Sequence, residues 1–166
     1  GVGSNSLAAI TTGVDNTAVG YAAGDSLTTG IQNVAIGKDA LTAVTTGGNN
    51  VAVGKGCLVA AAGGAHGNTG VGEAAGYTVT DGTRNTFIGK ATAGPTTAER
   101  SIIIGADLGD RGNTSNMVVI GTGSVVASFS GSATGWTFSS DGRDKTDIVD
   151  LPLGLDFINK LRPRKF

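Results

Sequence analysis

Apolar and small residues recur along the first 121 residues in a pattern with a period of about 17 residues. Each period contains a short run of the form Asn-x-Ala-Val/Ile-Gly or a close variant of it. The runs end at Gly3, Gly20, Gly37, Gly54, Gly72, Gly89, Gly105 and Gly121, with separations of 17, 17, 17, 18, 17, 16 and 16 residues. This regularity predicts a repeat protein that uses one small structural unit per period.

Each run is predicted to be a short β-strand, because the residue before every closing glycine is Val or Ile and β-branched residues favour strands. Alternate residues of a strand share a face. Val19 therefore lies on one face with Thr17, while Asn16 and Ala18 lie on the other. We expect the Val/Ile residues to fill the interior. The Ala column then faces another chain, and the interface thickens where the column enlarges to Phe87, Ile103 and Val119.

A second periodic element follows each closing glycine. Small or apolar residues occur seven positions later, at Ile10, Leu27, Val44, Ala61 and Val79, and glycines ten positions later, at Gly13, Gly30, Gly47, Gly64 and Gly82. Each unit thus reads strand, Gly corner, short strand, Gly corner, and glycine suits both corners because tight turns often need a positive φ. The extra residue of the 18-residue repeat falls at the second corner, near 65–67.

Such a unit cannot fold alone, so stacked units are expected to bury one another's apolar columns in an all-β, parallel β-roll or β-solenoid. About seven coils of 16–18 residues, at roughly 4.8 Å per coil, give a stack some 30–35 Å long. We expect three such chains to pack side by side as a homotrimer. The β-roll covers residues 1–121, and a Gly/Ser-rich connector covers 122–139.

Composition excludes several other classes of protein. The chain has 29 Gly, 5% aromatic and 15% charged residues, which disfavours an ordinary globular enzyme with a thick core. The net charge of −1 gives no indication of nucleic-acid binding, and no apolar run has the length needed for membrane insertion. The single cysteine, Cys57, excludes an internal disulfide and a cysteine-only metal site, and no cofactor is expected.

Several residues have both a structural and a functional interpretation, and the structural one is favoured. The column Asn16, Asn33, Asn50, Asn68 and Asn85 predicts an amide ladder between coils rather than a ligand site. The Thr pairs at 11–12, 28–29 and 45–46 suggest an ice-binding face less strongly, because the row breaks at 62–63. His66 is expected to be a surface residue at a corner, and Cys57 a small packing residue in a column with Ala23, Ala40 and Ala75.

The repeated Asn-x-Ala-Val/Ile-Gly motif resembles the head repeats of trimeric autotransporter adhesins, which are trimers of left-handed parallel β-rolls, and similar repeats occur in phage tail fibres. The resemblance covers roughly residues 1–121. It implies a structural, extracellular protein in either case. A bacterial adhesin head at the cell surface is the alternative to a viral tail fibre.

The C-terminal segment favours the tail fibre. Ser140, Asp141, Arg143, Lys145 and Ile148 match the opening of the self-cleaving intramolecular chaperone found on phage tail spikes and fibres, including endosialidases. That family continues with a helix and a Leu-Arg-Pro landmark. Here Leu151, Leu155, Ile158 and Leu161 fall at helical spacing, and Leu161-Arg162-Pro163 matches the landmark. Residues 140–166 therefore resemble the start of this chaperone, truncated at its C-terminal side.

The resemblance implies one catalytic event rather than a turnover enzyme. In the family, the chaperone drives trimerisation of the preceding β-fibre and is released by cleavage just before the Ser of the motif. Carried over, the scissile bond is Ser139–Ser140, with Ser140 as nucleophile and Lys145 as its activating base. The implied partners are two further copies of the chain, other virion tail proteins and a host surface receptor or glycan, with neither nucleic acid nor a metal.

Overall fold

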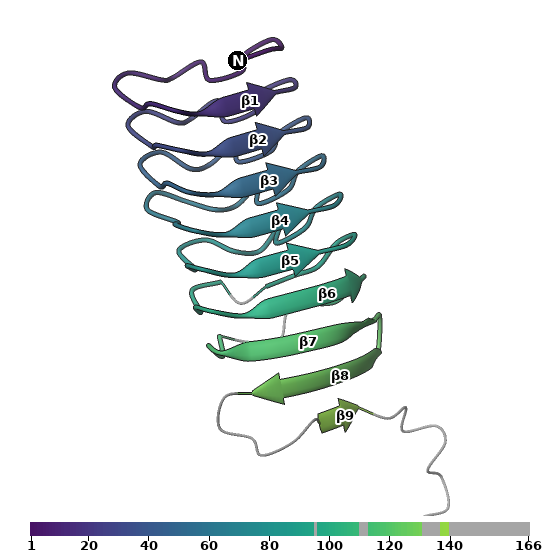
Figure 1. The fold of residues 1–166 in the computed structure, drawn as a ribbon. Coiled ribbons are helices and arrows are strands. Elements are labelled where there is room, and N and C mark those ends of the chain that lie inside the picture. Colours follow the sequence, from purple (N-terminus) through teal and green to yellow (C-terminus); the bar gives the residue numbers. More distant parts are fainter. Residues whose placement is uncertain (95, 110–112, 131–136, 140–166) are drawn as a thin grey trace, which may run out of the picture.

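The computed structural model is a stack of short strands in one sheet. It describes residues 1–94, 96–109, 113–130 and 137–139. The strands are β1 (Thr17–Val19), β2 (Val34–Ile36), β3 (Val51–Val53), β4 (Thr69–Val71), β5 (Thr86–Ile88), β6 (Ile102–Ala106), β7 (Met117–Thr122), β8 (Val125–Ser130) and β9 (Thr137–Ser139). They pair in chain order, as Figure 1 shows. The all-β prediction is confirmed, and no helix occurs in this part of the chain.

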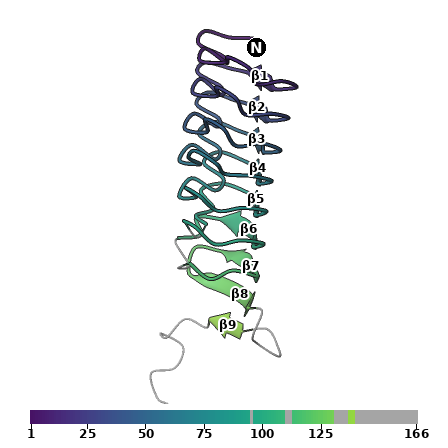
Figure 2. The ribbon, with the colours of Figure 1, turned by 90° about the vertical axis from the view of Figure 1, so that its left-hand side faces the viewer.

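Strands β1–β7 are parallel and form six turns of a β-solenoid. Each strand is followed by a loop that returns along the other side of a narrow stack to begin the next strand (Figures 1 and 2). Strands β8 and β9 then pair antiparallel, so the segment 122–139, expected as a connector, contributes two strands to the sheet. The returning arm has isolated parallel bridges, such as Val44 with Gly63, in place of the second short strand that we expected.

The two faces of the sheet are reversed relative to the sequence prediction. The middle residue of each short strand is buried and its neighbours are more exposed, so Ala18, Ala35 and Ala52 lie inside the coil. The Val/Ile residues lie outside. The prediction was wrong because the returning arm already supplies large buried side chains, such as Leu27 and Leu41, which leave room for little more than a methyl group from the strand.

Side-chain sizes inside the coil compensate one another. The thicker interface predicted at Phe87 does not form, since Phe87 is fully buried in the core. Its ring occupies space beside Gly76 and Gly94, where a Cβ would collide with it. In the coil before it, Gly70 leaves room for Cys57, whose sulfur occupies the position that a Cβ at Gly70 would take. The prediction that Cys57 packs in the Ala23, Ala40 and Ala75 column is confirmed by their shared burial.

The buried Asn side chains form a continuous ladder, as predicted. Asn33 donates its backbone N–H and its amide Nδ2 to Oδ1 of Asn16, both at 3.0 Å, and Nδ2 also donates to the carbonyl of Gly47 at 2.9 Å. The same pattern repeats at Asn50, Asn68 and Asn85, and Ser101 ends it by donating its N–H to Asn85 at 2.9 Å. Every coil is thereby joined to the next by charge-neutral hydrogen bonds inside the stack.

The two corners use glycine for different reasons. At the first corner, Gly20, Gly37 and Gly54 have φ of 136°, 130° and 138°, a conformation that only glycine adopts readily. At the second corner our explanation was wrong: Gly30 has no positive φ, but a Cβ there would lie 2.5 Å from the carbonyl oxygen of Gly47 in the next coil. Close stacking of backbones, rather than turn conformation, requires glycine at that position.

The extra residue of the longest repeat lies at the second corner, as predicted. Thr46 bonds to Gly63, 17 positions on, whereas Asn50 bonds to Ala65 where Asn33 bonds to Gly47, a step of 18. The insertion therefore falls at 63–65, slightly earlier than expected. The ladder bond from Asn68 to Asn50 stays at 3.0 Å, so the corner absorbs the additional residue without disturbing the register.

Replacing Gly37 by Ala is expected to destabilise the fold by about 3–5 kcal/mol, because the new Cβ requires a φ of 130° and lies 2.6 Å from the carbonyl of Gly54. The matched control is Gly64→Ala, at a glycine with open space around it and no positive φ, which should change stability by less than about 1 kcal/mol. Urea unfolding followed by circular dichroism measures both. Equal effects of the two variants would contradict the explanation.

Replacing Asn50 by Ala is expected to cost about 3–5 kcal/mol, since it removes a buried amide that bonds to Asn33, Asn68 and the carbonyl of Ala65. Asn16→Ala should cost only about 1 kcal/mol, because water reaches that half-buried end of the ladder. The free energies of unfolding of the two variants, compared with the wild type, test the ladder. A cost at Asn50 no larger than that at Asn16 would exclude a major role for it.

Candidate functional site

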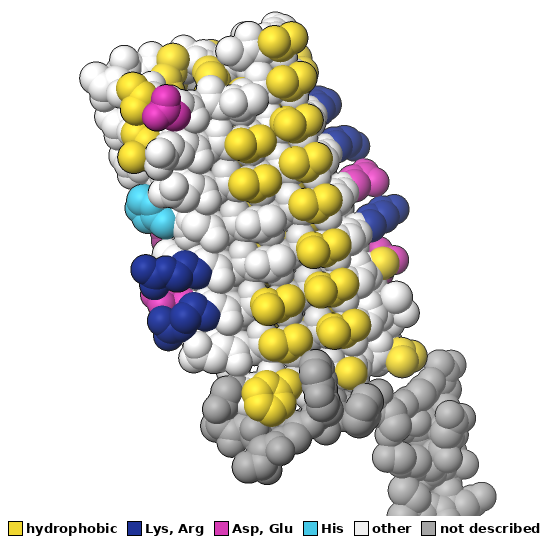
Figure 3. All heavy atoms as spheres, viewed as in Figure 1, with side chains coloured by type: hydrophobic (Ala, Val, Ile, Leu, Met, Phe, Trp, Pro, Cys, Tyr) yellow, Lys and Arg dark blue, Asp and Glu magenta, His cyan; other side chains and the backbone are white. Residues whose placement is uncertain are grey.

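The outer face of the sheet carries two continuous columns of apolar side chains, which we call the Val/Ile face. One column is Val2, Val19, Ile36, Val53, Val71, Ile88, Ile104 and Ile120; the other is Thr17, Val34, Val51, Thr69, Thr86, Ile102 and Val118. Val19, Val71 and Ile88 are 40%, 41% and 42% exposed. Figure 3 shows the columns as two yellow rows along the stack.

A surface of this kind indicates an interaction site, since isolated apolar residues are common on protein surfaces but long contiguous rows are not. Parallel in-register pairing keeps the columns straight, because each coil places the same position directly below its counterpart. The columns extend over all seven parallel strands. The arrangement therefore fits an extended partner or a second copy of the stack better than it fits a small molecule.

Charged side chains border the Val/Ile face where the strands end. Lys38, Lys55 and Glu73 each follow a closing glycine, and Lys55 Nζ lies 3.8 Å from the Glu73 carboxylate. Lys38 Nζ lies 3.6 Å from Asp39 and 5.7 Å from the centre of the Tyr21 ring. These groups are largely exposed, so they add little stability and give the apolar face a polar rim.

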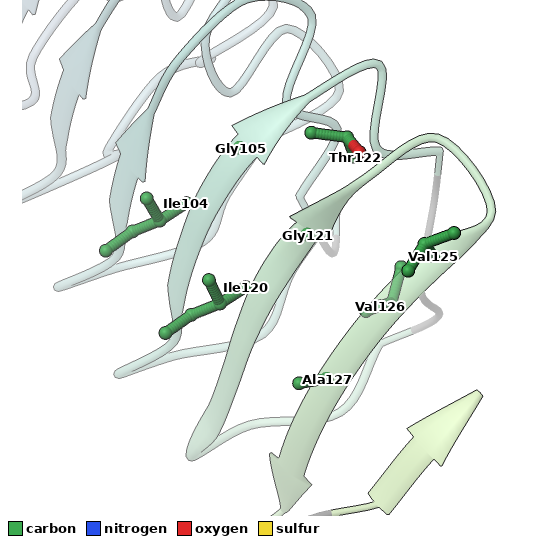
Figure 4. Close-up of a pocket in the computed structure, with 8 residues that line it drawn as sticks. All are labelled: Ile104, Gly105, Ile120, Gly121, Thr122, Val125, Val126 and Ala127. Atoms are coloured by element: carbon green, nitrogen blue, oxygen red, sulfur yellow. The ribbon is translucent and has the colours of Figure 1, made fainter. Parts of the chain in front are cut away.

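A hollow of about 610 Å³ interrupts the Val/Ile face near its C-terminal end. It is lined by Ile104, Gly105, Ile120, Gly121, Thr122, Val125, Val126 and Ala127 (Figure 4). The hollow arises because Gly105 and Gly121 have no side chains and Ala127 has a short one, between the larger Ile104, Ile120 and Val125. Its lining is almost wholly apolar and has no titratable group, so it does not resemble a catalytic site.

The proposed catalytic pair falls at the border of the described structure. Ser139 is the last residue of β9, which pairs with β8 through Val126. Ser140 and Lys145, the predicted C-terminal helix and the rest of 140–166 lie outside the described residues. Their assignment rests on the sequence motif alone.

Neither His66 nor Cys57 forms a reactive centre. His66 is exposed, as predicted, and its Nδ1 accepts a hydrogen bond of 3.0 Å from the N–H of Gly48. Within the described ranges, no three His, Cys, Asp or Glu side chains lie close enough together to hold a metal ion. Burial raises the pKa of the Cys57 thiol to about 11, which keeps it protonated and unreactive near neutral pH.

The polar columns that suggested ligand sites serve to join the coils. The buried Asn ladder leaves no Asn column on the surface for a ligand, so that alternative is excluded. In the Thr row, Thr11 Oγ1 donates to the carbonyl of Thr28 at 3.0 Å and Thr28 Oγ1 to that of Thr45 at 3.1 Å. Those hydroxyls are engaged in the stack rather than free for an external ligand.

Sequence reasoning missed the Val/Ile face, although a signal for it was present. The first position of the strands alternates between Thr and Val, as at Thr17, Val34 and Thr69, while the middle position accepts Gly, Ala or larger apolar residues but never a polar one. A column that tolerates Thr is more often exposed than one restricted to apolar residues. That contrast identifies the outer face without a structure.

Comparison of the chain with protein-family models, with curated proteins and with solved structures gives no match. A search of the described residues for a helix of the length and hydropathy of a bilayer span finds none.

The Cys57 thiol is expected to make stability depend on pH above 9. Its pKa rises from 9.0 in the unfolded chain to about 11 in the fold, so its contribution is complete below pH 9 and is lost as the pH rises through 11. The loss should amount to about 2–3 kcal/mol. Urea unfolding between pH 8 and 11 measures it, with Cys57→Ala as the control that removes the group. Parallel pH profiles for the two proteins would show that the thiol is not responsible.

Proposed function

We propose that this chain is a structural segment of a trimeric fibre, the shaft of a phage tail fibre involved in host attachment, in which three copies pack through the Val/Ile face. The observation that carries the proposal is the pair of apolar columns along the whole length of an otherwise polar stack. Burying a Val or Ile side chain that is about 40% exposed contributes roughly 1 kcal/mol. Repeated at each level, this favours association along the full stack.

The inferred arrangement keeps the predicted trimer but changes the face that forms it. The Ala column fills the interior of each coil and is not free to contact a neighbour. The Val/Ile face has the length and the apolar character that a lateral contact between stacks requires. The number three comes from the resemblance of the repeats to trimeric β-roll heads and tail fibres, and no charged or functional pocket on the sheet face competes with it as an explanation in the described part of the chain.

The C-terminal segment is proposed to begin an intramolecular chaperone that drives this trimerisation. Ser140 Oγ would attack the carbonyl carbon of Ser139 while Lys145 accepts the hydroxyl proton. The peptide C–N bond then breaks, the amine of Ser140 takes up a proton, and water hydrolyses the resulting ester. Lys145 can act as the base only where its pKa is lowered, for instance by burial in the assembled trimer. Since Ser139 ends β9, this cleavage would leave every strand of the sheet in the fibre.

Light scattering of the purified chain is expected to give about three times 16.3 kDa. Val71→Asp places a charge in the middle of the Val/Ile face and should shift the mass to that of a monomer with unchanged far-ultraviolet circular dichroism. The control is Val14→Asp, at a valine that is 56% exposed but lies outside the two columns, and it should leave the trimer intact. A wild-type monomer at micromolar concentration would refute the fibre model.

Ser140→Ala, made in the natural full-length protein, is expected to abolish processing and leave a single uncleaved band on a denaturing gel. The wild type should give a fragment whose intact mass corresponds to a C-terminus at Ser139. Ser139→Ala is the matched control, since it makes the same chemical change one residue earlier and should still be cleaved. Normal processing of Ser140→Ala, or an uncleaved wild type, would remove the chaperone assignment and favour the head of a bacterial trimeric adhesin instead.

A further inference from the structure

The hollow near the end of the Val/Ile face lies beside the most exposed large apolar side chain of the described sheet face. Val125 is 69% exposed, at the start of β8, and it lines one side of the hollow. Val125 and Ala127 pair with Thr122 and Ile120 and share the outer face with them (Figure 4). A projecting apolar side chain and an apolar recess therefore occupy the same level of the same face.

The Val/Ile face alone is small for a stable contact between two chains. Seven strands at about 4.8 Å and two columns about 10 Å across give on the order of 300 Å² per copy. Stable interfaces bury about 800 Å² per partner. Further contact area is needed, and an interlocking contact at the hollow supplies part of it.

Rotational symmetry brings the two features together. When copies are related by rotation about an axis parallel to the stack, every residue of one copy lies level with the same residue of the next. The Val125 side chain of one copy is then level with the hollow of its neighbour, whereas an antiparallel arrangement would separate them by the length of the stack. Gly105, Gly121 and Ala127 leave the recess open to receive it.

We infer that Val125 of each copy inserts into the hollow of the adjacent copy, so that the β7–β8 hairpins lock the chains together in parallel orientation. The inference rests on the proposed self-association through the Val/Ile face and specifies its register. The occupant is a second copy of this chain. The apolar lining, with Thr122 as its one polar side chain, matches a valine side chain and no charged group.

The test compares the trimer–monomer equilibrium of three variants by analytical ultracentrifugation. Ala127→Leu fills the recess and Val125→Ala shortens the inserted side chain, and each should weaken association at least tenfold. The double variant combines a filled recess with a shortened side chain and should recover part of that loss. Val14→Ala, at an exposed valine outside the Val/Ile face, is the control and should not change the equilibrium.

The outcomes separate this inference from the function on which it rests. A monomeric wild type refutes both. A trimeric wild type whose affinity is unchanged by Ala127→Leu and Val125→Ala keeps the fibre model and overturns the interlocking contact. If residues 140–166 of the same chain fill the hollow instead, Ala127→Leu will lower the free energy of unfolding without changing the association constant, which also overturns it.

Discussion

The fold depends on the row of buried asparagine amides that runs through the stack. Each coil contributes mostly methyl-sized groups to the interior, so apolar burial alone specifies its position only weakly. The amide of Asn50 instead has four partners, in the coils before and after it and at the facing corner. A shift of register by one residue would leave all of these buried groups unpaired, at a cost of several kcal/mol per coil. The ladder therefore fixes the period that the glycines at the corners make sterically feasible.

Much of the fold could be predicted from the sequence because its constraints are local and repeated. The closing glycines and the Asn column recur at every coil, so their spacing indicates a solenoid and their residue types indicate a turn and a ladder. Sidedness could not be predicted in the same way. Large residues usually lie inside, yet here Leu27 and Leu41 reach across from the returning arm and occupy the space that Val19 and Ile36 were expected to fill. Which wall of a thin coil provides the bulk is a property of the whole cross-section.

The candidate site divides between sequence and structure along the same line. Ser140 and Lys145 belong to a contiguous motif, and such a motif can be recognised without coordinates. The Val/Ile face and the hollow at Gly105 and Gly121 arise only when coils are stacked, because their members are separated by 16–18 residues along the chain. Chemistry that acts once can reside in a short segment, whereas a surface that acts along a fibre has to be assembled from every repeat.

The ladder and the outer face are linked by geometry. Because Asn33, Asn50 and Asn68 keep the coils in register, even across the 18-residue repeat, the outer columns remain straight and each level presents the same pair of side chains. Contacts between copies then add level by level, as neighbour terms do in other repeat proteins. Coils can be gained or lost without altering the chemistry of the interface. Only the β7–β8 hairpin, with its recess and Val125, differs from the repeat, and it is the one place where the height of neighbouring chains can be specified.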